Sequence, residues 1–197
     1  MDNKIRCKWC VGIDMYEKYH DEEWGIPVYD DAKLFEFLIL ETFQAGLSWI
    51  TILKKRNHFK LAFDDFDYKK MANYNESKIQ ELLLDAGIIR NQLKIRSAVI
   101  NAQMFMAVQK EFGSFSNYIW KFIDGKPIIN QPKTLKNVPA TTPLSDLISK
   151  DLKKRGFKFV GSTIIYAHMQ ATGMVDDHVE DCWKRTSKSQ FTKTFIF

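Results

Sequence analysis

The segment LFEFLILETFQAGLSWITILKKR, residues 34–56, is apolar over most of its length but contains a carboxylate, Glu41, in its interior. Three apolar residues lie within about 60° of this acid on a helix with about 100° per residue: Leu34, Phe37 and Leu38. Glu36 points away from that face, so we expect it to be solvated. Glu41 needs a partner, because burying an unpaired ionised carboxylate costs several kcal/mol.

Two kinds of partner fit Glu41. The first is an internal salt bridge or a helix-cap contact, and the second is a ligand that supplies hydrogen-bond donors. Gly46 interrupts the helical pattern, and Ser48 is a suitable N-cap for a second helix over residues 49–55. Trp49 would then stand at the bend, within reach of the group that Glu41 faces. An acid and a large π-face at one cavity suit a flat, nitrogen-rich ligand, including a cationic one.

The composition is that of a globular protein. A chain of 197 residues with 45% hydrophobic content is enough for one sizeable core, or for two small lobes that share one. No stretch approaches the length of a membrane span, and the N-terminal sequence MDNKIRCKWC has no apolar signal core, so we expect a cytoplasmic protein. In that compartment the three cysteines are expected to be metal ligands or buried thiols rather than disulfides.

The hydrophobic spacing predicts a mostly α-helical fold, without strand-like alternation or internal repeats. Residues of helix-capping type precede two expected helices: Asp30 or Asp31 before the helix of Glu41, and Thr142 with Pro143 before a later one. Gly156 and Gly173 are expected to end helices. Near the N-terminus, Tyr16, Tyr19 and His20 are spaced so that one helical face would carry all three.

The segment from residue 75 to residue 113 predicts two amphipathic helices joined by Asp85-Ala86-Gly87. Gly87 has the residue type of a helix C′ position, so we expect a hairpin with a very tight connection. One interpretation is an ordinary αα-hairpin. The other is a hairpin whose exposed backbone N–H groups hold a phosphate, with three basic side chains nearby: Arg90, Lys94 and Arg96.

A second group of basic residues gathers farther along the chain: Lys150, Lys153, Lys154, Arg155 and Lys158. A run of charges is compatible with a solvated surface as well as with a phosphate-binding one. The formal net charge of +5 and the pI near 9.0 allow a polyanionic partner but do not establish one.

His178 and Cys182 are four residues apart, so on a helix both could bind one metal ion. The candidates for the remaining ligands are Cys7, Cys10 and His20. Cys7 with Cys10 would give a Cys3His site, whereas Cys7 with His20 would give a Cys2His2 site and leave Cys10 as a buried thiol. A third interpretation is that these are unrelated core residues. Four protein ligands saturate tetrahedral zinc, so either site would be structural and would clamp the two chain ends together.

Five long segments together resemble the 3-methyladenine DNA glycosylase I family of helix-hairpin-helix DNA glycosylases. These segments are RCKW, YEKYHDEEWGIP, LETFQAGLSWITILKKR, LLLDAGIIRNQLKI and LKKRGFKFVGSTIIYAHMQATGMVDDHVEDC. The resemblance covers nearly the whole chain, and such a set of segments in one order is very specific. Two departures stand out: Asp176 occupies a position where the family usually has Asn, and Thr42-Phe43 replaces small or polar residues.

The resemblance implies an all-α, two-lobed domain over residues 1–183, followed by a basic tail over residues 184–197. It implies one structural zinc ion bound by Cys7, His20, His178 and Cys182, with Cys10 left out. It also implies a base pocket in which Glu41 is the catalytic residue. The other base-binding residues would be Tyr16, Tyr19 and Trp49, with Trp9 and Trp24 nearby.

The implied activity is repair of alkylated DNA. The enzyme would flip an alkylated adenine out of double-stranded DNA and hydrolyse the N-glycosidic bond of 3-methyladenine, leaving an abasic site. We expect a monomer without membrane contact. The expected phosphate contacts are Gly87, Arg90, Lys94, Lys153, Lys154 and Arg155. Asp146 is expected to be favourable first-turn charge on its helix and not the catalyst.

Two alternatives belong to other classes. A zinc-stabilised DNA-binding module without catalysis would need only the hairpin and the basic cluster, but it leaves Glu41 unexplained. A zinc hydrolase would need an open metal position, which four protein ligands would not leave.

Overall fold

The structure, a computed structural model, describes residues 4–185, and these residues are mostly helical. The α-helices are α1 (Asp14–Glu22), α2 (Asp31–Gln44), α3 (Trp49–Ala62), α4 (Tyr68–Met71), α5 (Glu76–Leu84), α6 (Gln92–Phe112), α7 (Phe115–Trp120), α8 (Pro143–Lys154) and α9 (Ser162–Ala171). The 3-10 turns are η1 (Asp64–Phe66), η2 (Lys121–Ile123) and η3 (Leu135–Asn137), and the strands are β1 (Ile128–Ile129) and β2 (Val175–Asp176). The prediction of a mostly α-helical fold is confirmed. The predicted tail over residues 184–197 lies almost entirely outside the described residues.

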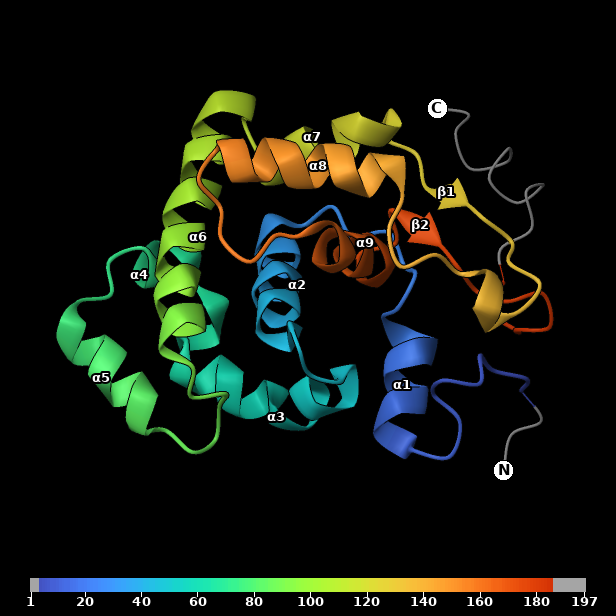
Figure 1. The fold of residues 1–197 in the computed structure, drawn as a ribbon, viewed down its shortest axis with the longest axis horizontal. Helices are drawn as coiled ribbons and strands as arrows, with labels where there is room; N and C mark the ends of the chain where they lie inside the picture. Colours follow the sequence, from blue (N-terminus) through green and yellow to red (C-terminus); the bar gives the residue numbers. More distant parts are fainter. Residues whose placement is uncertain (1–3, 186–197) are drawn as a thin grey trace.

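Helix α2 occupies the centre of the fold, with α3, α6, α7 and α9 packed around it (Figure 1). Every residue of α2 from Leu34 to Phe43 is buried. The buried hydrophobic residues form one continuous cluster that reaches from the N-terminal segment to the C-terminal one. A helix buried on all sides has no solvated face, and this explains why its sequence is apolar almost throughout.

The prediction that Glu36 is solvated is wrong. Glu36 is buried, its Oε1 accepts a hydrogen bond of 2.8 Å from Arg56 Nε, and its Oε2 accepts one of 3.0 Å from Lys33 Nζ. Arg56 comes from α3, which covers the face of α2 that a single amphipathic helix would expose to water. An ion pair therefore stands where a solvated side chain was expected.

The start of α2 is capped as predicted. Asp30 is the N-cap, and its Oδ1 accepts a hydrogen bond of 2.8 Å from Lys33 N. The neighbouring Asp31 accepts from the backbone N–H groups of Phe115 and Ser116, at 2.9 and 2.8 Å. This carboxylate therefore joins the first turns of α2 and α7, where partial positive charge favours an anion.

The end of α2 is held by a buried lysine. Lys94 Nζ donates hydrogen bonds to Phe43 O at 2.8 Å and Ala45 O at 2.6 Å. Burial lowers the pKa of this amine. Lys94 was expected near a DNA phosphate, but the structure directs its ammonium group inward, where it satisfies carbonyl oxygens at a helix C-terminus.

Helix α3 is longer than predicted, because it continues from Trp49 to Ala62. Ser48 stands at the N-cap position, but its hydroxyl is hydrogen-bonded to the Thr51 hydroxyl at 2.7 Å instead of to the backbone. The bend between α2 and α3 forms at Gly46, whose φ of +78° favours glycine.

The predicted helical hairpin is present as α5 and α6, but its connection differs from the prediction. Helix α5 ends at Asp85 in extended backbone, and Gly87 is not in the left-handed region. The Gly87 N–H donates a hydrogen bond of 2.7 Å to Asp85 Oδ1. Glycine is needed at position 87 for space, since a Cβ would lie 2.9 Å from a side-chain carbon of His58.

The C-terminal third confirms the predicted cap and end of one helix and shows that His178 and Cys182 are not on a helix. The Thr142 side chain caps α8 by accepting from Ser145 N at 3.1 Å, and Gly156 follows that helix with a φ of +100°. The segment VDDHVEDC is not a helix: Val175 and Asp176 form β2, which pairs in parallel with β1. His178 and Cys182 therefore do not meet through helical spacing. Among the described residues, no helix is long and apolar enough to cross a membrane.

Replacing Lys94 by Met should lower the free energy of unfolding by about 2–3 kcal/mol, because charge-assisted hydrogen bonds to two backbone carbonyls are lost. Urea denaturation followed by circular dichroism measures this change. Arg96→Met on the same helix is the matched control: Arg96 forms an ion pair with exposed Glu76, and its loss should change the stability much less than the loss of Lys94. Equal losses in the two variants would contradict the capping role of Lys94.

Candidate functional site

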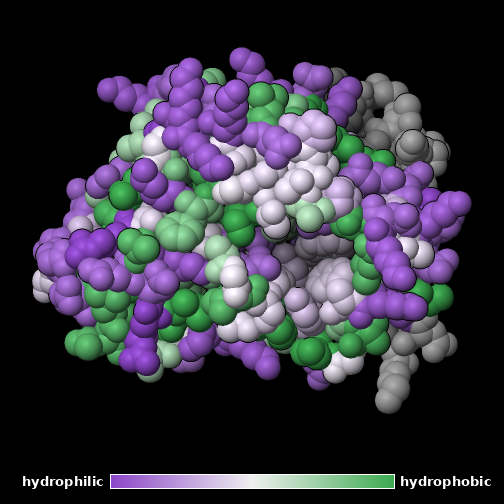
Figure 2. Space-filling model, in the orientation of Figure 1, coloured by the Kyte–Doolittle hydropathy of each residue, from purple (hydrophilic) through white to green (hydrophobic). Residues whose placement is uncertain are grey.

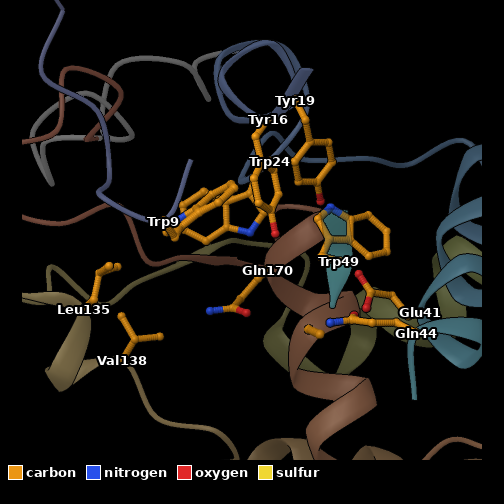
Figure 3. A pocket seen from close by; sticks show the side chains of 11 residues that line it. Trp9, Tyr16, Tyr19, Trp24, Glu41, Gln44, Trp49, Leu135, Val138 and Gln170 are labelled. Carbon is orange, nitrogen blue, oxygen red and sulfur yellow. The ribbon is translucent and has the colours of Figure 1, made fainter. Parts of the chain in front are cut away.

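A cavity of about 200 Å³ opens between α1, the end of α2, the start of α3 and α9. The space-filling view is hollowed beside α1, and residues of intermediate hydropathy surround the hollow (Figure 2). Figure 3 shows the side chains that line it. They are Trp9, Tyr16, Tyr19, Trp24, Glu41, Gln44, Trp49, Leu135, Val138, Ala167 and Gln170. All six residues expected to bind a base lie in this one cavity.

Glu41 is the acidic residue of the cavity. It is 2% exposed, and its Oε2 atom is buried without a hydrogen-bond partner among the described residues. Burial raises the pKa of this carboxyl group well above its usual value. The internal salt bridge that would have explained Glu41 is therefore not formed by any residue that the structure describes.

Trp49 and Tyr19 stand next to Glu41 (Figure 3). The Trp49 Nε1 atom is also buried without a partner among the described residues, and its ring centroid is 5.4 Å from that of Tyr19. Burial raises the pKa of Tyr19, and the nearby charge of Glu41 raises it further. Two polar atoms thus have their hydrogen-bonding capacity unused, and both belong to residues lining the cavity.

The opposite wall is aromatic. The ring centroid of Trp9 is 4.9 Å from that of Tyr16 and 5.1 Å from that of Trp24, and both pairs meet edge to face. This geometry is favourable for aromatic pairs and fixes the three rings relative to one another. Trp9, Tyr16 and Trp24 form one rigid wall.

Five residues of the cavity were not predicted: Gln44, Leu135, Val138, Ala167 and Gln170. Gln44 could have been predicted from the sequence as a cavity residue, because it follows Glu41 by three residues and therefore lies on the same face of the helix. Ala167 and Gln170 have the same spacing on α9, but nothing in that helix singles them out. Leu135 and Val138 come from the proline-rich connection before α8, which has no helical or strand periodicity.

A cluster of cysteine and histidine residues lies beside this cavity. The potential ligand atoms of Cys7, His20 and Cys182 lie within 4.8 Å of one another, a group that could hold a metal ion. The Cys182 Sγ atom is 3.3 Å from His20 Nε2. Cys10 is outside the group, and its thiol donates a hydrogen bond of 3.0 Å to Cys7 O.

His178 adjoins this cluster. Its ring centroid is 5.0 Å from that of His20, and its Nε2 is buried without a partner among the described residues. The other nitrogen, Nδ1, is 2.7 Å from Asp176 Oδ1, and His20 Nδ1 is likewise 2.8 Å from Asp21 Oδ1. A carboxylate on Nδ1 leaves Nε2 of each imidazole as the atom that can bind a metal.

The two thiols of the cluster share a hydrogen bond. This bond lowers the pKa of the Cys182 thiol and raises that of the Cys7 thiol. A thiolate is the form of cysteine that binds metals, so the donors present fit a soft or borderline divalent ion.

The residues expected to contact phosphate fall in two separate places. Lys55 Nζ donates to Ala86 O and Gly87 O of the hairpin connection, at 3.0 and 3.1 Å, and Arg90 is exposed beside it. Lys153 and Lys154 are exposed at the end of α8, which lies near the opposite end of α6 from the hairpin (Figure 1). The basic cluster and the hairpin therefore do not form one surface.

Arg155 belongs to the basic cluster but is engaged by acids. Its guanidinium is 2.7 Å from both Glu111 Oε2 and Asp151 Oδ2. Asp146 is exposed in the first turn of α8, as predicted, and does not line the cavity.

Comparison with known proteins identifies the family to which this chain belongs. Residues 9–185 match the family described as methyladenine glycosylase. A DNA-3-methyladenine glycosylase of Haemophilus influenzae is 47% identical over 182 residues, which are 92% of this chain and 98% of the relative. A crystal structure of 3-methyladenine DNA glycosylase I has a TM-score of 0.90 and 46% identity, and the similarity covers 92% of this chain and all of the other.

A further solved structure is a single-site variant of 3-methyladenine DNA glycosylase I in complex with 3-methyladenine. Its TM-score is 0.89 at 34% identity, covering 92% of this chain and 98% of the other. The helical fold is thus that of a base-excising glycosylase. The chain belongs to the methyladenine glycosylase family.

The raised pKa of Glu41 predicts a specific dependence of stability on pH. Between pH 4.5, the ordinary value for Glu, and the raised value, the folded protein keeps a proton that the unfolded chain has lost. Stability must therefore fall as pH rises through this window, by at most about 1.4 kcal/mol per pH unit for one group. Glu41→Gln should remove this decline, as measured by urea denaturation between pH 4 and pH 9. Parallel curves for the two proteins would show that the pKa of Glu41 is not raised.

Proposed function

We propose that this protein is a DNA repair glycosylase that flips alkylated adenine out of duplex DNA and hydrolyses its N-glycosidic bond, releasing 3-methyladenine. The observation that carries this function is the carboxylate of Glu41, which is buried in an aromatic cavity and whose Oε2 has no hydrogen-bond partner among the described residues. The names of the relatives and the complex of one similar structure with 3-methyladenine support the same conclusion. The products would be free 3-methyladenine and an abasic site in double-stranded DNA.

The residues of the cavity suit this substrate chemically. Methylation at N3 makes adenine in DNA formally cationic, which weakens the N-glycosidic bond before any enzyme acts. Such a base needs recognition more than it needs a strong acid. Glu41 would accept hydrogen bonds from the base and complement its charge. Trp49, Tyr16 and Tyr19 would stack on the base. Trp9 and Trp24 would support the opposite wall.

The protein would use the α5–α6 hairpin to hold DNA, as a helix-hairpin-helix glycosylase with two helical lobes in one domain over residues 1–183. Lys55 supports this role, because it satisfies the carbonyl oxygens of the connection and adds positive charge next to Arg90. Gly87 would allow close approach of the backbone to a phosphate. We favour the hairpin over the cluster of Lys153, Lys154 and Arg155 as the main contact with DNA phosphates, since Arg155 is already paired with two acids. We expect the enzyme to act as a monomer in the cytoplasm.

The cysteine and histidine cluster would hold one structural zinc ion through Cys7, His20, His178 and Cys182. Supporting this set, His178 Nε2 is buried without a partner among the described residues, and Asp176 orients its ring. Zinc would supply no chemistry to the reaction, because four protein ligands leave no position for water. It would join the C-terminal segment to the N-terminal segment, whose Trp9 lines the cavity.

A non-catalytic DNA-binding module stabilised by zinc is the alternative function. It would require the hairpin and the metal cluster but not the buried acid. A protein of that kind would bind methylated DNA without releasing free base.

Glu41→Gln should reduce the single-turnover rate of 3-methyladenine release from methylated duplex DNA, because it keeps the shape of the side chain but removes the charge. Trp49→Ala should remove a stacking surface worth roughly 1–3 kcal/mol, a decrease of the rate of about 5- to 150-fold. Asp146→Asn is the control and should release base at the wild-type rate. Full activity per folded molecule in Glu41→Gln, with folding checked by thermal melts, would exclude Glu41 as a base-binding residue.

Purified protein should contain one equivalent of zinc per chain, measured by atomic emission. Cys7→Ala and His178→Ala should lose the metal and melt at a lower temperature, since the two chain ends are no longer joined. Cys10→Ala is the matched control and should keep its zinc. Loss of zinc from the Cys10 variant would overturn the ligand assignment.

A further inference from the structure

Gln170, on the last turn of α9, lines the cavity and is held from behind by a buried acid. Its Nε2 donates a hydrogen bond of 2.8 Å to Asp177 Oδ2. Asp177 is 1% exposed and also accepts from Tyr166 OH at 2.8 Å and Asn130 Nδ2 at 2.7 Å. The carboxylate is thus surrounded by three donors, two from α9 and one from the segment after β1.

This arrangement fixes the orientation of the Gln170 amide. Turning the amide by 180° would place its oxygen against the Asp177 carboxylate, so that two acceptors would face each other in a buried position. Its nitrogen must therefore remain toward Asp177. In Figure 3 the amide oxygen of Gln170 lies on the side of Glu41 and Gln44, and the nitrogen lies on the other side. Gln170 therefore presents its amide oxygen, a hydrogen-bond acceptor, to the cavity, and the contact with Asp177 keeps this oxygen from turning away.

The other polar residues of the cavity can adapt to a ligand. Glu41 can accept hydrogen bonds when ionised and donate one when protonated, and burial raises its pKa in favour of the protonated form. No hydrogen bond to a described side chain fixes the amide of Gln44, so it can turn either its oxygen or its nitrogen to a ligand. Neither residue by itself distinguishes a base that offers a donor from one that offers an acceptor.

We propose that Gln170 is a specificity-determining residue, which selects 6-amino purines over 6-oxo purines through its fixed amide oxygen. This inference rests on the proposed glycosylase function and names the substrate class within it. The exocyclic amine of 3-methyladenine has two N–H donors, enough for Glu41 and for Gln170. The O6 atom of 3-methylguanine is an acceptor and would be left facing another acceptor that cannot rotate. A site built to accept a hydrogen bond rejects a ligand that cannot donate one.

The test uses duplex DNA treated with a methylating agent, which carries both 3-methyladenine and 3-methylguanine. Free bases are separated by chromatography, and single-turnover release rates give the ratio of the two rates for each protein. Gln170→Met keeps the length of the side chain without its acceptor, and the preference for 3-methyladenine should fall about tenfold or more. Gln103→Met is the matched control: Gln103 is an exposed glutamine on α6 that donates one hydrogen bond, to Ala72 O.

A second variant tests the fixed orientation itself. Asp177→Asn can meet Gln170 with either an oxygen or a nitrogen, so the Gln170 amide becomes free to turn, and the preference should fall while Gln170 is still present. Zinc content and melting temperature are measured on the same samples. An unchanged ratio in folded Gln170→Met, or an equal decrease for both bases, would overturn the inference. Wild-type protein that releases no 3-methyladenine would instead overturn the proposed function.

Discussion

Glu41 lies in the helix that the rest of the fold surrounds, and residues 4–185 provide no hydrogen-bond partner for its Oε2 atom. Removing a carboxylate from water without compensation is costly, and the group responds with a raised pKa. The neighbouring Trp49 Nε1 also has no partner in this part of the chain. A folded chain normally completes the hydrogen bonds of its buried polar groups, so two incomplete groups facing one cavity indicate that a ligand completes them.

Glu36, on the same helix, shows what the fold does with a structural acid. Burial by itself would raise the pKa of Glu36, but hydrogen bonds from Arg56 outweigh it, and the pKa is lowered. Glu36 and Glu41 have the same side chain, lie on the same helix and are both buried. They differ only in their partners. Arg56 and Lys33 stabilise the charged form of Glu36, whereas Glu41 faces the cavity, where a base would have to supply the donors.

The cavity also depends on segments that are far apart in the sequence. The ring of Trp24 is 4.6 Å from that of His178, and the ring of Trp9 is 5.5 Å from that of His20. The histidines of the metal cluster thus pack against the aromatic wall. Gly173, with a φ of +66°, lets the end of α9 approach the chain at Ile26, where a side chain would overlap the backbone. Because His20 and His178 pack against Trp9 and Trp24, a distortion of the metal cluster would also move the aromatic wall of the cavity.

Local sequence was sufficient to determine the helices, the Asp30 and Thr142 caps, the hairpin and the unusual burial of Glu41. These features depend on periodicity and on neighbours within a few residues. The resemblance to a family also identified the six aromatic and acidic residues that meet in the cavity.

What the sequence did not determine was which partner each polar group finds. Lys94, expected at the DNA surface, caps α2 from a position about fifty residues away, and Glu36 is paired instead of solvated. His178 approaches His20 through a strand pairing, not through helical spacing. The orientation of Gln170 depends on a carboxylate that also binds Tyr166 and Asn130. Hydrogen bonds and ion pairs act over a few ångströms in space, so only the tertiary structure decided them.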